Sequence, residues 1–251
     1  MKVITVINNK GGVGKSAVTF ELASALTRLK KRVLCIDLDE QSTISIQALS
    51  ESNGEYSIFD VLTGAADIEE SIIKTKNFDI LKGDDRTRSL DKALPNMEDM
   101  FSLADTLEKI DSKYDYCLID EPAHLGACAY LGLFATKDGG VLIPVEPDVS
   151  TIKGAVNVYE FINKNKRVIP DLKIMGIVKV KFRTWNFHKA ALDLVTKLSK
   201  KMECKVFKTN IRDCTALRES RAEKKSIFDY KKKSNAAIDF MDLAKEVART
   251  K

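Results

Sequence analysis

Two hydrophobic patterns alternate along the chain. Short apolar runs, typical of buried strands, are separated by longer segments in which apolar residues recur every three or four positions, as in amphipathic helices. The predicted strands are residues 3–7, 33–37, 78–81, 116–120, 140–145, 174–180 and 205–208. The predicted helices are residues 15–29, 97–109, 123–135, 152–163, 187–201 and 235–248. This alternation predicts an α/β fold, a single doubly wound domain with a mostly parallel central sheet flanked by helices.

Length and composition fit one domain that spans residues 1–251. The chain has 44% apolar and 31% charged residues, as soluble globular proteins do. No run approaches the roughly 20 uninterrupted apolar residues that a membrane-spanning helix needs. The last predicted helix carries an apolar stripe that we expect to pack on the domain. Residues 41–92 are the least regular and most polar region, and we expect short helices there.

The five cysteines are odd in number, and no two of them are spaced as Cys-x-x-Cys. This usage disfavours a disulfide framework and a metal site, and it is typical of thiols in a reducing compartment. We therefore expect a cytoplasmic protein.

A glycine-rich segment with two lysines follows the first predicted strand. It spans residues 10–16, reads KGGVGKS, and opens the first predicted helix. Strand, glycine-rich turn and helix are the context that a phosphate-binding loop requires. Its glycines let the backbone approach an anion at the N-terminus of the helix. Lys15 can lie along the β- and γ-phosphates of a nucleotide, and the Ser16 hydroxyl can bind Mg²⁺.

Two other predicted strands end in acidic residues. One leads to Asp37 and Asp39, and the other ends at Asp120. In a doubly wound sheet the carboxyl ends of these strands face the phosphate loop. We expect these carboxylates to hold Mg²⁺ and to position the attacking water.

From the phosphate loop onward the chain resembles the ParA/MinD superfamily. Lys10 stands at a position that the general loop pattern leaves free and marks the deviant form of the loop, while Asn9 stands where the general pattern has glycine. The strong motifs cover residues 1–160. In ParA-like proteins the extra lysine crosses a dimer interface to the partner's nucleotide. The resemblance therefore implies an ATP-dependent homodimer that hydrolysis releases.

The resemblance also assigns roles to the two acidic strand ends. Residues 37–41 match the family's Asp-x-Asp-Pro-Gln with Glu40 in place of proline, and the second aspartate, Asp39, is expected to orient the attacking water. The other motif departs from Asp-x-Pro-Pro at Ala123, and Asp120 is expected to hold Mg²⁺ through water. Slow ATP hydrolysis, accelerated by a partner protein, is the implied activity.

The predicted site residues form three sets, with ATP and Mg²⁺ as the cofactors. The catalytic residues are Lys10, Lys15 and Asp39. The nucleotide-binding residues are Lys10, Gly11, Gly12, Val13, Gly14, Lys15, Ser16, Ala17, Asp120, Thr209 and Asn210. The last two are expected near adenine because the family grips the base at the ends of the last strands. The residues expected at Mg²⁺ are Ser16, Asp39 and Asp120.

Charge is unevenly distributed along the chain. Residues 171–251 carry 21 Lys+Arg and 10 Asp+Glu, a net of +11, whereas the remaining residues carry 20 and 26, a net of −6. A basic C-terminal part predicts a surface that meets a polyanion, with a solvated lysine-rich face as the alternative. In ParA this part binds DNA non-specifically in the ATP-bound dimer. The candidate DNA contacts are Lys181, Arg183, Arg212, Arg218, Arg221, Lys224 and Lys225.

The resemblance implies partition or positioning of a plasmid, mobile element or chromosome region. It also implies a ParB-like centromere-binding activator and nucleoid association of the ATP-bound form. A MinD-like membrane-surface positioning ATPase is the alternative, and a non-hydrolysing binder with the same fold is a third reading. Cys128 lies alone where iron–sulfur relatives need cysteine pairs, and Tyr230 is the one tyrosine in the tail, where tyrosine kinases of this class have clusters.

Overall fold

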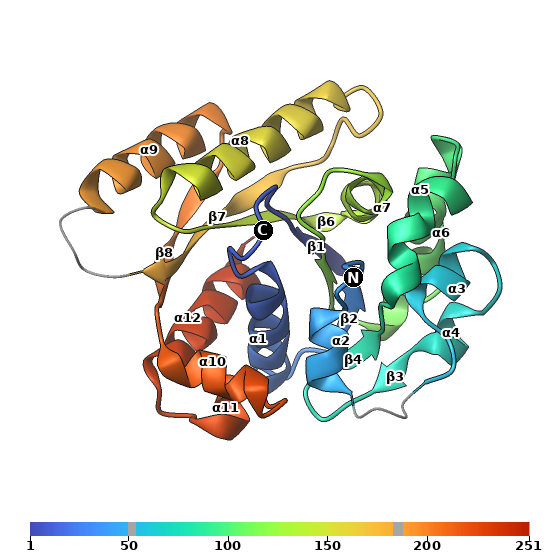
Figure 1. The fold of residues 1–251 in the computed structure, drawn as a ribbon, viewed down its shortest axis with the longest axis horizontal. Coiled ribbons are helices and arrows are strands. Elements are labelled where there is room, and N and C mark those ends of the chain that lie inside the picture. Colours follow the sequence, from blue (N-terminus) through green and yellow to red (C-terminus); the bar gives the residue numbers. More distant parts are fainter. Residues whose placement is uncertain (50–53, 183–187, 251) are drawn as a thin grey trace.

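The computed structural model describes residues 1–49, 54–182 and 188–250. Within them an eight-stranded sheet has the order β3-β4-β2-β5-β1-β6-β7-β8 (Figure 1). Neighbouring strands are parallel except for the β3–β4 pair. The strands are β1 (Lys2–Val6), β2 (Val33–Asp37), β3 (Ile73–Lys74), β4 (Asp79–Leu81), β5 (Tyr116–Asp120), β6 (Asp138–Val145), β7 (Ile174–Phe182) and β8 (Lys205–Arg212). The predicted mostly parallel sheet is confirmed.

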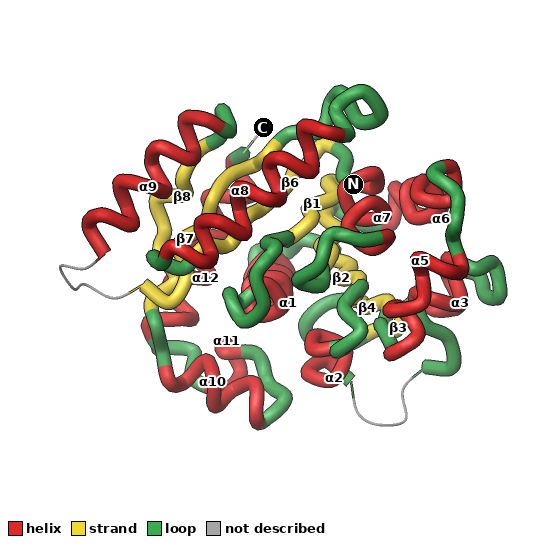
Figure 2. Tube along the Cα trace, turned by 45° about the horizontal axis from the view of Figure 1, so that its top comes forward, coloured by secondary structure: helices red, strands yellow, loops and turns green. Residues whose placement is uncertain are grey.

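Helices cover both faces of the sheet (Figures 1 and 2). Core residues of α1 (Lys15–Arg28), α2 (Thr43–Ala48), α10 (Thr215–Ala222), α11 (Ile227–Tyr230) and α12 (Asn235–Arg249) form one apolar cluster. The other cluster takes its helical residues from α3 (Ile58–Leu62), α4 (Ile68–Ser71), α5 (Leu90–Ala93), α6 (Ser102–Glu108), α7 (Ala127–Ala135), α8 (Val149–Lys164) and α9 (His188–Lys201). This two-sided cover is the doubly wound arrangement that the sequence predicted.

The central strands are buried on both sides, which explains their continuous apolar runs. Every residue of β2 and β5 is buried. Because successive side chains of a strand point to opposite faces, Leu34 and Ile36 belong to one cluster and Cys35 to the other. A strand of this kind fits only in the middle of a sheet with helices on both faces.

The last helix packs on the domain as predicted. Phe240, Leu243, Ala244 and Val247 of α12 are buried in the same cluster as the apolar face of α1. Among the helices of the described residues, none combines the length and the apolar composition that crossing a bilayer would require.

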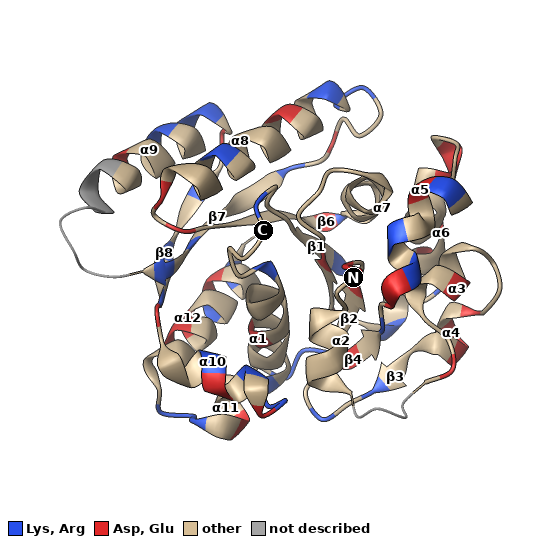
Figure 3. Ribbon diagram, viewed as in Figure 1, with Lys and Arg blue, Asp and Glu red and all other residues tan. Residues whose placement is uncertain are grey.

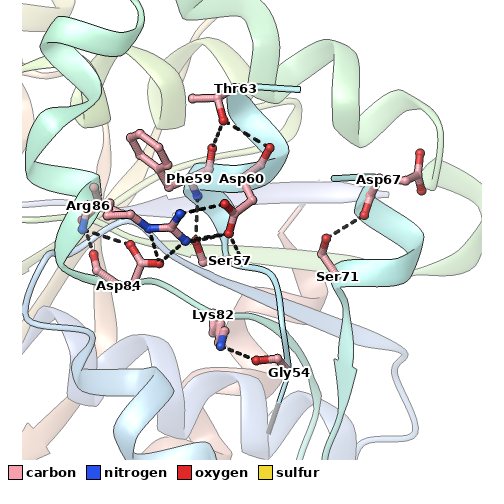
Figure 4. A network of polar contacts seen from close by, with 11 residues as sticks. Gly54, Ser57, Phe59, Asp60, Thr63, Asp67, Ser71, Lys82, Asp84 and Arg86 are labelled. Carbon is pink, nitrogen blue, oxygen red and sulfur yellow. Dashed lines mark hydrogen bonds and ion pairs between the residues drawn. The ribbon is translucent and has the colours of Figure 1, made fainter. Parts of the chain in front are cut away.

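Residues 41–92 contain the expected short helices, and a polar network holds part of the region together (Figure 4). The Arg86 guanidinium lies 2.6 Å from carboxylate oxygens of both Asp60 and Asp84, and it donates to Ser57 Oγ at 3.1 Å. The hydrogen bonds from Arg86 lower the pKa of the Asp60 carboxyl. Polar contacts, rather than apolar periodicity, therefore fix the start of α3 against the turn after β4.

Candidate nucleotide site

The carboxyl ends of β1, β2 and β5 meet at one edge of the sheet. Asp120, the last residue of β5, is paired with Val6 of β1 on one side and with Asp37 of β2 on the other. The phosphate loop leaves β1 at this same edge. The chain passes from β1 to β2 on one side of β1, whereas β6 lies on the other side. Ligands of doubly wound sheets bind at such a switch point, at the carboxyl ends of the strands.

A cavity of about 690 Å³ opens at this edge. Its floor is residues 11–18 of the phosphate loop and the first turn of α1. Residues 39–41 and 122–124, which follow β2 and β5, form one side. The ends of β7 and β8 and one face of α10 form the other. Apart from Lys10, every predicted loop residue therefore lines the cavity.

Two glycines give the loop its backbone shape. Gly12 has φ of 77° and Gly14, the N-cap of α1, has φ of 96°, both in the left-handed region that glycine adopts without a steric penalty. No side chain in the described part of the chain caps the N-terminus of α1. The first N–H groups of this helix therefore face the cavity as the donors of an anion site.

Lys15 is a buried ammonium, and no carboxylate of the described residues is in hydrogen-bonding contact with it. Its side chain is 6% exposed, and Nζ donates to the Lys10 carbonyl at 3.3 Å. Burial lowers the pKa of Lys15, while the nearby acids Asp120 and Asp39 act to raise it. An anion bound at the helix N-terminus would stabilise this buried charge, as the phosphates of a nucleotide do in a phosphate loop.

Asp120 is buried completely next to the loop. Its Oδ1 accepts a hydrogen bond from Thr19 Oγ1 at 3.1 Å, and its Oδ2 has no hydrogen-bond partner among the described residues. Burial and the neighbouring Asp37 raise the pKa of this carboxyl to about 8, while Ser16 and Lys15 act to lower it. A divalent cation nearby would favour the ionised form, so the orphaned oxygen and the Ser16 hydroxyl fit a magnesium site.

Asp37 supports the turn that carries Asp39. The Asp37 carboxylate accepts from the backbone N of Asp39 at 3.2 Å, and from the backbone N and Oγ of Ser45 at 3.0 and 2.7 Å. Burial raises its pKa to about 6. Asp39 itself lines the cavity, and its Oδ1 accepts from the Gln41 backbone N at 3.0 Å. Glu40 in place of the family's proline therefore still leaves Asp39 facing the site.

Asn9 fixes the loop to two neighbouring elements, a role that the sequence did not reveal. Its Nδ2 donates to the Ala123 carbonyl at 2.6 Å, and its Oδ1 accepts from Asn157 Nδ2 of α8 at 2.8 Å. The preceding Asn8 donates to the carbonyls of Pro144 and Thr151. The departure from glycine at position 9 thus provides a clamp between the loop, the turn after β5 and α8.

Glu121 follows Asp120 but points to the opposite face of the sheet. Both of its carboxylate oxygens are buried without a hydrogen-bond partner among the described residues. A Cβ placed at Gly132 of α7 would lie 1.8 Å from Glu121 Oε1, so the side chain packs directly on that glycine. Burial raises its pKa well above the ordinary range. Glu121 does not line the cavity and is not placed to position water there.

The two predicted adenine contacts do not line the cavity. The backbone N and Oγ1 of Thr209 both donate to Glu246, and Asn210 also lies outside the cavity wall. Strand β8 continues to Arg212, four residues beyond its predicted end at residue 208. The apolar wall of the cavity is therefore formed by later residues, which include Ile211, Cys214, Leu217 and Phe240.

Lys and Arg positions occur on many elements of the fold, those of the C-terminal part among them (Figure 3), and the candidate DNA contacts lie in several environments. Arg212 is engaged by Asp239 at 2.6 Å, and Lys181 Nζ lies against the phosphate loop. Arg218 and Arg221 are exposed on α10 and also line the cavity. Lys224 and Lys225 are exposed in the turn after α10. Arg183 lies outside the described residues.

The fold and the loop define a P-loop nucleotide-binding protein of the deviant, two-lysine type. The AAA domain family model matches residues 1–174. The sporulation initiation inhibitor protein Soj of Bacillus subtilis is 29% identical over 98% of both chains. A virulence plasmid ParA family protein of Chlamydia psittaci is 26% identical over 98% of this chain and 94% of its own.

A solved structure agrees with these relatives. The septum site-determining protein MinD of Pyrococcus horikoshii, complexed with Mg-ADP, has a TM-score of 0.79 and 26% identity over 99% of this chain and 96% of its own. The chain therefore belongs to the AAA domain family that this model describes and to the ParA/MinD superfamily of ATPases. The resemblance seen in the sequence is confirmed, and a role in partition or positioning is the general function of this type.

Proposed function

We propose that this protein is an ATP-dependent dimerising ATPase that binds DNA non-specifically and partitions or positions a DNA cargo. The observation that carries the proposal is the opposite placement of the two loop lysines. Lys15 is buried in the cavity, whereas Lys10 is exposed and does not line it. A cation that faces outward from its own site can act on a nucleotide held by a second subunit.

ATP and Mg²⁺ are the cofactors that suit the cavity. The phosphates would lie at the N-terminus of α1 against Lys15, and Mg²⁺ would be held by Ser16 and, through water, by Asp120. When bound there, Mg²⁺ would supply positive charge that neutralises the phosphates. Asp39 lines the cavity on the side formed by the residues that follow β2 and β5, and its carboxylate would orient the attacking water. The Mg-ADP complex of the archaeal MinD supports this assignment.

DNA binding in the ATP-bound dimer is proposed for the surface of α10 and the turn after it. Arg218, Arg221, Lys224 and Lys225 are exposed there, although Arg218 is paired with Asp213 and Lys225 with Glu223. The membrane alternative would use an amphipathic helix, but the apolar face of α12 is already buried against the domain. We therefore favour a nucleoid-associated protein that works with a ParB-like activator.

Fluorescence anisotropy on unrelated DNA duplexes tests the proposal. Binding should require ATP, ignore sequence, and weaken with salt along a log–log slope of about −5 if the dimer neutralises about six phosphates. Arg218→Glu with Arg221→Glu should abolish DNA retention. The matched control, Lys164→Glu with Lys166→Glu, makes the same change in charge at the exposed end of α8 and should bind like the unmodified protein.

The double variant must be checked for nucleotide binding because both arginines also border the cavity. Light scattering with a slowly hydrolysed ATP analogue measures its dimer fraction. Loss of DNA with retained dimerisation supports the assignment of α10. ATP-dependent liposome binding, without DNA binding even at about 50 mM salt, would favour the membrane-surface alternative. Absence of phosphate release would favour the non-hydrolysing binder.

A further inference from the structure

Lys181 reaches across the cavity mouth to the backbone of the phosphate loop. Its Nζ donates to the Gly12 carbonyl at 2.7 Å and lies 2.5 Å from Glu146 Oε1. Glu146 follows the end of β6, so the contact joins three elements that are distant in sequence. Lys181 lines the cavity together with the loop. The ammonium is thus held between one backbone carbonyl and one carboxylate.

An irregularity in β7 directs this side chain. Between the paired positions Lys179–Asn210 and Phe182–Arg212, β7 has one residue more than β8, which is a β-bulge. Lys181 lies in the bulge with φ of 50°, a conformation that non-glycine residues rarely adopt and that carries a steric penalty. Bulges redirect side chains relative to a regular strand. The local backbone therefore points Lys181 at the loop at a cost in conformational energy.

The contact with Gly12 constrains a donor of the phosphate site. A trans peptide is planar, so the Gly12 carbonyl and the Val13 N–H lie in one plane and point in opposite directions. Lys181 fixes the direction of the carbonyl and therefore that of the N–H. Gly12 itself is exposed, and no atom of the described residues lies within 4 Å of the position that a Cβ would take, whereas Val13 at the other end of this peptide is buried in the core.

We propose that Lys181, with Glu146 as its counter-ion, is a positioning residue that holds the Gly12–Val13 peptide ready for the phosphates of the nucleotide. This inference rests on the proposed ATP-binding function and goes beyond it. It also reassigns a lysine that the charge distribution marked as a DNA contact. The N–H of this peptide would donate to phosphates that ATP and ADP share. We therefore expect Lys181 to affect the binding of both nucleotides.

Titration with fluorescent ATP and ADP analogues tests the role of Lys181 in the full chain. Lys181→Met should raise the dissociation constants of both nucleotides about tenfold or more, the effect of losing a charge-assisted hydrogen bond. Lys181→Arg should restore binding to within a few-fold. Glu146→Gln should give a smaller increase. The matched control is Lys208→Met, which removes the same charge from an exposed position of β8 outside the cavity.

DNA binding at saturating ATP separates the two roles of Lys181. If Lys181 is a positioning residue, DNA binding by Lys181→Met should show the same log–log salt slope as binding by the unmodified protein. Unchanged nucleotide affinity together with a shallower slope would overturn the inference and return Lys181 to the DNA contacts. Thermal unfolding shows whether Lys181→Met is folded, and Glu146→Gln tests the same contact if it is not. If the unmodified protein bound no nucleotide, the proposed function would fail as well.

Discussion

Glu21 offers a direct test of how burial controls stability in this fold. The residue lies in α1, is 1% exposed, and accepts hydrogen bonds from the Ile227 backbone N at 3.0 and 3.1 Å on its two carboxylate oxygens. It thereby ties the helix of the phosphate loop to α11. Burial, the largest influence, raises the pKa of Glu21 from 4.5 to about 8 although the hydrogen bond from Ile227 lowers it.

The sign of the pH dependence follows from this shift. Above pH 4.5 the unfolded chain releases the proton, whereas the folded protein keeps it until about pH 8. The contribution of Glu21 to stability is therefore fully present below pH 4.5 and is lost as the pH rises to 8. Each pH unit in this window costs about 1.4 kcal/mol, so the loss between pH 5 and pH 7 is roughly 3 kcal/mol.

Glu21→Gln keeps an acceptor oxygen and removes the ionisation. Its amide can impose a fixed penalty, but that penalty does not change with pH. We therefore expect the stability of the variant relative to the unmodified protein to rise by roughly 3 kcal/mol from pH 5 to pH 7. The raised pKa values of Asp120 and Asp37 also make the folded protein less stable as the pH rises. Both proteins contain these two residues, so their contributions cancel in the difference between variant and unmodified protein.

Urea unfolding at several pH values between 5 and 8 measures this difference. Glu160→Gln, at an exposed position of α8, is the matched control and should show no comparable trend. If the stability of Glu21→Gln minus that of the unmodified protein stays constant or falls as the pH rises, the reasoning is refuted. That result would mean that the folded protein ionises Glu21 as easily as the unfolded chain does.

Other predictions concern the cavity. Lys10→Ala should abolish ATP-dependent dimerisation but keep nucleotide binding by the monomer, whereas Lys15→Ala should weaken nucleotide binding itself. Light scattering and titration distinguish the two, and an unchanged dimer fraction in Lys10→Ala would exclude the action of Lys10 across the interface. Asp39→Ala should bind ATP and dimerise without hydrolysing it. Near-normal phosphate release would transfer the water-orienting role to Glu40 or Glu121; of these two, Glu40 lines the cavity and Glu121 is buried outside its wall.

The elements with strong periodicity could be predicted from the sequence. Strands β2 and β5 begin and end where the apolar runs do, and α12 differs from its predicted range by one residue. Strand β3 has only two residues, too few to show an apolar pattern that would predict a strand. Helix α10 lies outside the helices that the sequence predicted. Its boundaries depend on packing against the C-terminal helices, which the local sequence does not encode.

The phosphate side of the cavity was predictable and the opposite wall was not. The loop and the acidic strand ends are local sequence motifs. A parallel sheet places the carboxyl ends of its strands at one edge, so the sequence predicts that these motifs lie close together. The far wall depends on where β8 ends, and the extension of this strand to Arg212 moves the wall beyond Thr209. A charge count also cannot show that Arg212 is already engaged by Asp239 or that a bulge turns Lys181 toward the loop.

Gly154 shows how closely α8 approaches the loop. A Cβ at this position would lie 2.2 Å from Asn8 Oδ1, 3.1 Å from the Asn9 carbonyl carbon and 3.1 Å from Lys10 Cβ. Asn8 cannot easily move aside because its Nδ2 donates to two buried carbonyls. Gly154→Ala must therefore push α8 and the start of the loop apart, which disturbs the segment that carries Lys10.

We expect Gly154→Ala to weaken ATP binding and ATP-dependent dimerisation together. Crowding of this kind costs about 1–3 kcal/mol, and the better helix propensity of alanine offsets up to about 1 kcal/mol of it. Lys153→Ala, the exposed neighbour on the same helix, is the control for nucleotide titration and thermal unfolding. If Gly154→Ala has normal ATP affinity and raised stability, the start of the loop can move away from α8 without disturbing nucleotide binding. In that case the Asn9–Asn157 clamp would not set the geometry of the phosphate site.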